Sequence, residues 1–211
     1  MNLISHRGFW TQLPERNTPA AFQRSWAEGF GIETDIRDLA GQLVISHDPP
    51  QGSPLTLAAF LQDYQQMGRN TPLALNIKSD GLHTLLGAAL REHQVSNYFV
   101  FDMSIPDSLG YLRDGLTVYA RQSEYEPELA FSDQAAGVWL DMFLSEWPSA
   151  EHIQQHLSAN RPVCIVSPEL HKRDYQPFWT WLRSTDLHRQ DLLTLCTDLP
   201  VQARTFFNGS N

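Results

Sequence analysis

The chain has 211 residues, with 24 acidic and 15 basic side chains and a formal net charge of -9. A composition of 42% hydrophobic and 18% charged residues is that of a globular protein, and the length fits one domain or at most two small ones. The negative charge disfavours duplex nucleic acid and anionic membrane surfaces as partners, because both are polyanions and the basic residues are scattered. A small phosphate-containing ligand is compatible with it, since a bound cation can offset local negative charge.

No apolar segment has the length that crosses a bilayer, so we expect no membrane insertion. The chain enters an expected strand almost at once, which leaves no room for a secretory signal and favours a cytoplasmic location. Cys164 and Cys196 lie in apolar strand-like runs and are expected to be buried free thiols, as a reducing compartment favours. The sequence does not indicate an oligomeric state.

Strand-like and helix-like segments alternate along the chain. Thr18 is expected to be the N-cap of the first helix, Pro19 its first residue, and Gly29 its end. The expected strands are residues 2–6, 31–38, 73–78, 98–102, 116–121, 137–141, 162–166 and 192–197, with a turn at 39–42 that returns as an extension over 43–47. The expected helices are residues 19–28, 57–67, 81–93, 106–112, 150–157, 175–182 and 201–207.

This alternation predicts an α/β protein with a parallel sheet and right-handed crossovers. Eight units point to a small (β/α)8 TIM barrel that occupies residues 1–211 as a single domain, near the lower size limit of that fold. Residues 122–136 fit a helix worst, because Pro127 and Asp133 interrupt it. The main alternative is an open doubly wound sheet, but no glycine-rich nucleotide-binding motif follows the first strand.

Three short clusters carry chemistry, and each lies in or at the end of an expected strand: residues 6–8 (His-Arg-Gly), 33–35 (Glu-Thr-Asp) and 47–48 (His-Asp). Glu33 and Asp35 are two residues apart on a strand and therefore project from the same face. Two adjacent carboxylates repel each other unless a cation lies between them, and Mg²⁺ and Ca²⁺ take oxygen ligands. A metal flanked by two histidines and an arginine suits attack on a phosphate ester.

The ordered series of clusters resembles the glycerophosphodiester phosphodiesterase family, within the phospholipase-C-like phosphodiesterases. That family shows His-Arg-Gly after its first strand, Pro-Glu-Asn-Thr before its first helix, Glu-x-Asp on its second strand, His-Asp after a hairpin and Glu-x-Lys on its third strand. This chain has His6-Arg7-Gly8, Pro14-Glu15-Arg16-Asn17-Thr18, Glu33-Thr34-Asp35 and His47-Asp48. The resemblance covers roughly the first eighty residues. Beyond them only Phe101-Asp102 and residues 197–200 look similar.

Two departures from the family pattern stand out. Arg16 is an insertion in the Pro-Glu-Asn-Thr segment, and the third strand reads Asn76-Ile77-Lys78, with asparagine in place of glutamate. An amide oxygen can ligate Mg²⁺ or Ca²⁺ but brings no charge. The metal would then be held less tightly, or another carboxylate would be recruited, for which the candidates are Asp102, Glu124 and Glu169.

The resemblance implies a metal-dependent phosphoric diester hydrolase that converts a small glycerophosphodiester-type substrate to an alcohol and a phosphomonoester. It implies the following roles: His6 and His47 as general acid and base in either order, Arg7 and Lys78 as phosphate-binding residues, and Glu33, Asp35 and Asn76 as ligands of Mg²⁺ or Ca²⁺. Two alternatives stay open. One is a related phosphodiesterase that acts on a lysophospholipid head group, and the other is a non-catalytic barrel that binds a phosphate ligand, which the asparagine favours.

Three further residues outside these clusters could suggest a function. His152 and His156 are four apart on an expected helix, but no glutamate follows His152, so a solvated helix face is expected rather than a zinc site. Trp10 follows the His-Arg-Gly cluster and is expected to wall the substrate pocket.

Overall fold

The computed structural model describes residues 1–209, in two compact units. The first, here the amino-terminal unit, is His6–Val118; the second, the carboxy-terminal unit, combines Met1–Ser5 with the described residues from Tyr119 onward. Over the described residues, eight strands that each have a parallel partner alternate with helices, and one further strand, β3, is antiparallel. This is the element order of a (β/α)8 TIM barrel, so the predicted fold class is confirmed.

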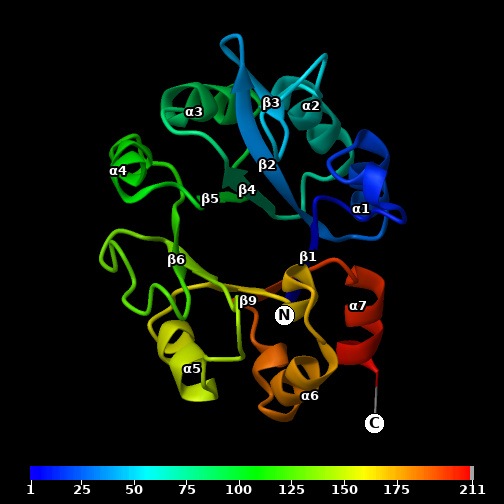
Figure 1. Ribbon diagram of the computed structural model, residues 1–211, viewed down its shortest axis with the longest axis vertical. Coiled ribbons are helices and arrows are strands. Elements are labelled where there is room, and N and C mark those ends of the chain that lie inside the picture. The colour runs from blue at the N-terminus through cyan, green and yellow to red at the C-terminus, as the bar shows by residue number, and fades with distance from the viewer. Residues whose placement is uncertain (210–211) are drawn as a thin grey trace. The chain divides into compact units, whose positions relative to one another are not determined.

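The amino-terminal unit contains a sheet with the strand order β5-β4-β2-β3 (Figure 1). Its strands are β2 (Gly31–Leu39), β3 (Gln42–Ile45), β4 (Leu73–Ile77) and β5 (Tyr98–Phe101). Its helices are η1 (Leu13–Glu15), α1 (Pro19–Ala27), α2 (Leu57–Met67), α3 (His83–Glu92) and α4 (Ile105–Arg113).

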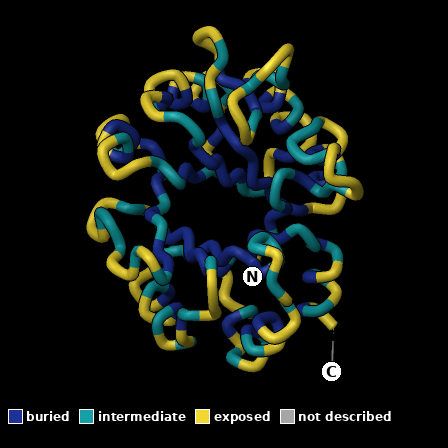
Figure 2. The backbone as a smooth tube through the Cα atoms, in the orientation of Figure 1, coloured by how far each residue is buried: buried dark blue, intermediate teal, exposed yellow. Residues whose placement is uncertain are grey.

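The carboxy-terminal unit contains a parallel sheet with the strand order β1-β9-β8-β7-β6. Its strands are β1 (Asn2–His6), β6 (Tyr119–Gln122), β7 (Gly137–Leu140), β8 (Val163–Val166) and β9 (Leu193–Thr197). Its helices are α5 (Ala150–Ser158), η2 (Pro168–His171), α6 (Gln176–Ser184), η3 (Leu187–Arg189) and α7 (Pro200–Asn208). In each unit the strands are mostly buried, and the exposed residues lie on turns and on the outer faces of helices (Figure 2).

Most expected elements lie within two residues of their observed ends. The strand expected at 116–121 begins later, at Tyr119, because Val118 makes only an isolated bridge to Val100. The segment 122–136 forms turns, and the interrupted helix is absent there. Cys164 and Cys196 are buried and form no disulfide, as predicted. Among the described residues, no helix has the length and apolar character that a membrane span requires.

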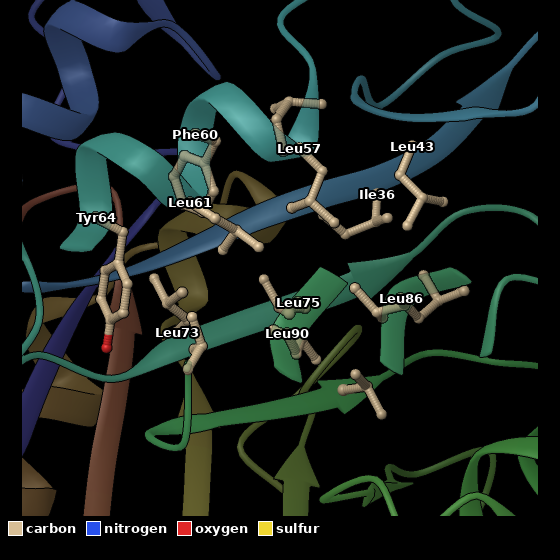
Figure 3. Close-up of a cluster of buried hydrophobic side chains, with 14 of the residues drawn as sticks. Ile36, Leu43, Leu57, Phe60, Leu61, Tyr64, Leu73, Leu75, Leu86 and Leu90 are labelled. Carbon is tan, nitrogen blue, oxygen red and sulfur yellow. The ribbon is translucent and has the colours of Figure 1, made fainter. Parts of the chain in front are cut away.

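One face of the amino-terminal sheet forms a hydrophobic core with α2 and α3. Ile32 and Ile36 on β2 are fully buried, and their register partners on β4 are Leu73 and Ile77. Figure 3 shows Leu57, Phe60, Leu61 and Tyr64 of α2 directed at this face. Alternation along the strands therefore directs the intervening residues to the opposite face.

That opposite face of the sheet is polar. Glu33 and Asp35 lie on it, beside Ala74 and Asn76 on the neighbouring strand. The next positions in the alternation are Arg37 on β2 and Lys78, whose backbone N–H donates to the Ile36 carbonyl just beyond β4. The sheet thus collects two carboxylates, an amide and two cations on one surface, as the sequence predicts for Glu33 and Asp35.

A tight hairpin joins β2 to β3. Leu39 pairs with Gln42, so the turn has two residues, Ala40 and Gly41, with φ of 50° and 81°. Positive φ at both positions is the requirement of the type I′ turn that two-residue hairpins favour. The hairpin returns the chain along β2 and delivers His47 two residues after the end of β3.

Candidate active site

The His-Arg-Gly segment is a backbone turn that brings Arg7 against β2. Arg7 and Gly8 have positive φ of 57° and 82°, and a Cβ on residue 8 would lie 2.9 Å from the backbone of Ala21. Only glycine combines that φ with that approach. The Arg7 N–H donates to the Glu33 carbonyl at 2.9 Å and lies 3.2 Å from the Glu33 Oε2. The cluster is therefore attached to the strand that carries the carboxylates.

Glu33 is a buried carboxyl group, with 1% of its surface exposed. Burial, and to a smaller extent the neighbouring Asp35, raise the pKa of Glu33 to about 7, although His6, Arg7 and Lys78 oppose the shift. The His6 Nε2 lies 3.9 Å from the Glu33 Oε2. A carboxyl group with this pKa is poorly compensated, and a nearby cation would favour its charged form.

Asp35 is fully buried and has three polar neighbours. The Arg7 Nε lies 3.0 Å from its Oδ2, the Asn17 Nδ2 donates to the same oxygen at 2.8 Å, and the Lys78 Nζ lies 3.7 Å from its Oδ1. Lys78 also lies 3.4 Å from the Asp102 Oδ2. The two residues predicted to bind phosphate are therefore both paired with the site carboxylate in this structure.

Asn17 is a site residue that the sequence placed only in a loop motif. Its backbone N–H donates to the Arg7 carbonyl, and its side-chain Oδ1 accepts from the Thr34 hydroxyl at 2.8 Å. It adopts a left-handed φ of 58°, which asparagine tolerates better than most residues. The only sequence feature that could have indicated this role is its place in the Pro-Glu-Arg-Asn-Thr segment. Strand periodicity does not connect residue 17 to residue 35.

Asn76 lies beside Asp35 in the parallel register and is 8% exposed. Among residues 1–209, the buried Oδ1 atoms of both Asn76 and Asp35 have no hydrogen-bond partner. Two adjacent buried oxygens without donors are unusual, because such atoms ordinarily find a partner. These two oxygens point to a missing cation or hydrogen-bond donor at this position.

His47 lies in the loop that follows β3 of the hairpin. Its side chain is 44% exposed, and its Nδ1 lies 2.9 Å from the Asp48 Oδ1, so Nε2 is the ring nitrogen that does not take part in this contact. Its backbone carbonyl accepts from the Arg37 Nε at 3.0 Å. Within the described chain, no contact joins the His47 ring to Glu33 or Asp35, whereas His6 contacts Glu33 directly.

Two of the alternative carboxylates are already engaged. Glu124 accepts from the backbone N–H groups of Phe143, Leu144 and Ser145, at 3.1, 2.6 and 3.3 Å. Glu169 accepts from the Ser167 and Thr197 hydroxyls. Both carboxylates therefore bind groups within the carboxy-terminal unit in this structure. The third, Asp102, is paired with Lys78.

The residues present fit a hard divalent cation. Residues 1–209 hold no group of three or more His, Cys, Asp and Glu side chains arranged for a metal, and one of the three predicted ligands is an asparagine. Glu33, Asp35 and Asn76 would supply oxygen ligands, and two of these side chains carry the unpartnered buried oxygens. Neighbouring cations at Arg7 and Lys78 would lower the affinity compared with an unpaired carboxylate cluster.

Three other aromatic and histidine positions can now be placed. Trp10 donates its ring N–H to the His6 carbonyl at 3.2 Å, and the guanidinium of Arg16 lies over the Trp10 ring, 4.3 Å from the ring centre.

The expectation of a solvated face for His152 and His156 is wrong, because both Nε2 atoms lie 3.0 Å from the Gln122 Oε1. Helical periodicity predicted that both rings would be solvent-exposed, but both contact the side chain of Gln122 on β6.

The chain matches no protein-family model, and no curated protein matches it in sequence. Its fold, however, matches solved structures over nearly the whole chain. A glycerophosphodiester phosphodiesterase from Agrobacterium tumefaciens superposes with a TM-score of 0.74 and 16% identity, over 99% of this chain and 100% of that one. A Galdieria sulphuraria protein, proposed to be such an enzyme, superposes with a TM-score of 0.78 and 16% identity, over 99% and 98%.

A Ca²⁺-dependent phosphatidylinositol-specific phospholipase C from Streptomyces antibioticus also shares the fold, with a TM-score of 0.63 and 8% identity, over 98% of this chain and 95% of that one. These likenesses show the fold class of the protein: a (β/α)8 barrel of the kind seen in these phosphodiesterase and phospholipase structures. At such identities the likeness shows the fold alone.

Proposed function

We propose that this protein is a metal-dependent phosphodiesterase that hydrolyses a glycerophosphodiester-type substrate to an alcohol and a phosphomonoester. The observation that carries the proposal is the buried pair Glu33 and Asp35, with Arg7, Lys78 and His6 within 4 Å of its carboxylate oxygens. This combination provides both a place for a cation and donors for a phosphate group. The likeness of the fold to glycerophosphodiester phosphodiesterases supports the substrate class.

Glu33, Asp35 and Asn76 would hold the metal, Mg²⁺ or Ca²⁺. When bound, such an ion polarises a phosphoryl oxygen and offsets the charge of the transition state. Arg7 and Lys78 are each 19% exposed, so both can move from their ion pairs with Asp35 to phosphate oxygens. The guanidinium of Arg7 can contact two of those oxygens, and Lys78 acts as a point charge.

His6 and His47 would be the general acid and base. One removes the proton from the attacking hydroxyl group, which belongs to water or to the glycerol 2-position, and the other protonates the leaving oxygen. Each ring has a carboxylate partner: Glu33 lies 3.9 Å from the Nε2 of His6, and Asp48 lies 2.9 Å from the Nδ1 of His47. The partner of His47 orients the ring so that its Nε2 can exchange the proton.

A second function is favoured by one specific observation. Arg7 and Lys78 offset the charge of Asp35. Asn76 stands where the family pattern has a glutamate, so the site carries less negative charge than a site with three carboxylates would. A barrel that binds a phosphate ligand without hydrolysing it would need only the cations. A measurement of substrate turnover distinguishes this binding function from catalysis.

Hydrolysis of bis(p-nitrophenyl) phosphate, followed with EDTA and then with added Mg²⁺, Ca²⁺ or Mn²⁺, tests the proposal. We expect release of nitrophenol that depends on one of these ions and is reduced at least about 100-fold in Glu33→Gln, because that variant removes a charged ligand. Phosphate-ester binding without turnover under all these conditions would support the non-catalytic function instead.

A further inference from the structure

Arg37 has no assigned role, yet it lies on the same strand face as the carboxylate pair. Glu33, Asp35 and Arg37 follow each other at intervals of two on β2, so their side chains leave the strand in the same direction. Arg37 is opposite Val44 in the antiparallel pairing with β3, at the base of the segment that carries His47.

The contact made by Arg37 is specific. Its Nε donates to the His47 carbonyl at 3.0 Å, and no ion pair with Arg37 occurs among residues 1–209. A structural arginine is commonly paired with a carboxylate, whereas this one contacts a backbone oxygen of a proposed catalytic residue. The contact adds a second attachment of the same loop to β2, because the Ser46 N–H donates to the Asp35 carbonyl at 3.0 Å.

The remaining contacts near His47 do not fix its distance from the strand. The Asp48 carboxylate orients the ring through Nδ1, and the Ser46 hydroxyl donates to the Asp48 carbonyl at 2.7 Å. Both contacts are local to residues 46–48 and would move with the loop. Arg37 is the side chain of β2 that attaches the His47 peptide itself.

We propose that Arg37 is a positioning residue, which holds His47 at a fixed place relative to Glu33 and Asp35 through its hydrogen bond to the His47 carbonyl. This inference rests on the proposed function, since it assigns the arginine to a proton-transfer group. Displacement of such a group by about 1 Å can reduce a rate by orders of magnitude.

Two substitutions of equal length separate the hydrogen bond from the charge. Arg37→Gln retains an N–H donor at the position of the arginine Nε but removes the charge, whereas Arg37→Met removes both. We expect Arg37→Met to lower kcat about tenfold with little change in KM, and Arg37→Gln to retain most of the wild-type kcat. Equal losses in the two variants, expressed mainly in KM, would show that the guanidinium binds the phosphate group and would overturn the proposal.

A double-mutant cycle and a spectroscopic readout complete the test. In a His47→Ala background, Arg37→Met should change kcat less than twofold, because there is no ring left to position. The His47 ring resonances in the NMR spectrum should shift or broaden in Arg37→Met but not in Arg37→Gln or in the exposed control Arg189→Met.

The resonances are observed without substrate, so they separate two failures. Altered His47 signals in a protein that hydrolyses no phosphodiester would uphold the positioning role and reject the proposed function. Unchanged kcat and unchanged His47 signals in Arg37→Met would reject the positioning role.

Discussion

At the scale of residues, the site depends on how a few buried oxygens are compensated. Asp35 has two cations and an amide donor around it, whereas the carboxyl group of Glu33 keeps a pKa raised to about 7 by burial. Asn76 adds an oxygen without charge beside them. The asparagine is the feature in which this chain departs from the family it resembles, and we expect it to weaken the affinity for a cation.

Replacing Asn76 by glutamate tests that role. Asn76→Glu restores a third carboxylate next to Asp35, and we expect the dissociation constant for Mg²⁺ or Ca²⁺ to fall about tenfold, since affinity in oxygen sites rises with ligand charge. Calorimetric titration measures it. Gln66→Glu on the exposed face of α2 adds the same charge outside the site and should leave the affinity unchanged. An unchanged or weaker affinity in Asn76→Glu would mean that residue 76 is not a ligand.

The histidines make a separate prediction at this scale. His6→Ala and His47→Ala should each lower kcat by roughly 100-fold or more, the range typical of general acid–base groups, while circular dichroism and Tm stay near wild type. His93→Ala, at the end of α3, is the matched control and should retain full turnover. Wild-type turnover in either site variant would remove that histidine from the mechanism.

At the scale of elements, local pattern predicted the strands that carry the site but not the contacts between loops. Alternation along β2 was enough to place Glu33 and Asp35 together, and the register with β4 then brings Asn76 beside them. The contacts of Asn17 with Asp35 and of Arg37 with His47 were not predicted. Both join residues ten or more positions apart, and strand or helix periodicity does not encode such pairs.

The helix ends likewise show that positions were predicted but individual hydrogen bonds were not. Thr18 precedes Pro19 at the start of α1, as predicted, but its hydroxyl donates to the Glu15 carbonyl rather than capping the helix. Thr56 does cap α2, by accepting from the Ala59 N–H at 3.2 Å. Residue type indicates where a helix begins, whereas the preceding loop decides which hydrogen bond the hydroxyl makes.

The β2–β3 hairpin that delivers His47 has a residue poorly suited to its turn. Ala40 adopts a φ of 50°, where a Cβ is unfavourable, and Asn-Gly is the preferred pair for this turn. We expect Ala40→Asn to raise the free energy of unfolding by about 0.5–1 kcal/mol in urea denaturation, without changing kcat. The control Ala88→Asn, on the exposed face of α3, should lower it by about 0.5 kcal/mol. A loss of stability in Ala40→Asn would contradict the turn assignment.

At the scale of the whole molecule, the predicted element order and fold class are confirmed, and the (β/α)8 fold is shared with known phosphodiesterases at 8–16% identity. Such order is predictable because strand and helix periodicities differ and alternate clearly. The single-domain organisation, the bound metal and the substrate stay predictions. They depend on long-range packing and on ligands, about which periodicity carries no information.

His156 should make one of the contributions to the pH dependence of the stability of the chain, alongside Glu33 and His152. Burial lowers the pKa of His156 to about 4, so the fold favours the neutral ring. Its stabilising contribution is complete above the unfolded pKa near 6.5 and is lost as the pH falls toward 4, because the unfolded chain then binds the additional proton. The loss should be on the order of 1 kcal/mol, given partial solvent screening.

Urea denaturation between pH 4 and pH 7 measures this dependence. Between pH 7 and pH 4, His156→Gln should lose about 1 kcal/mol less stability than the wild type, whereas His93→Gln should give the wild-type curve. An identical slope in His156→Gln and wild type would show that His156 is not responsible.

The most direct measurement of the central claim is ³¹P NMR of a soluble glycerophosphodiester incubated with the protein and Mg²⁺ or Ca²⁺. We expect the diester resonance to be replaced by that of a phosphomonoester, with EDTA stopping the conversion and Glu33→Gln and His6→Ala each slowing it about 100-fold or more. A diester resonance that persists with wild-type protein and every metal, or a conversion that is equally fast in both variants, would contradict the assignment of a phosphodiesterase site to these residues.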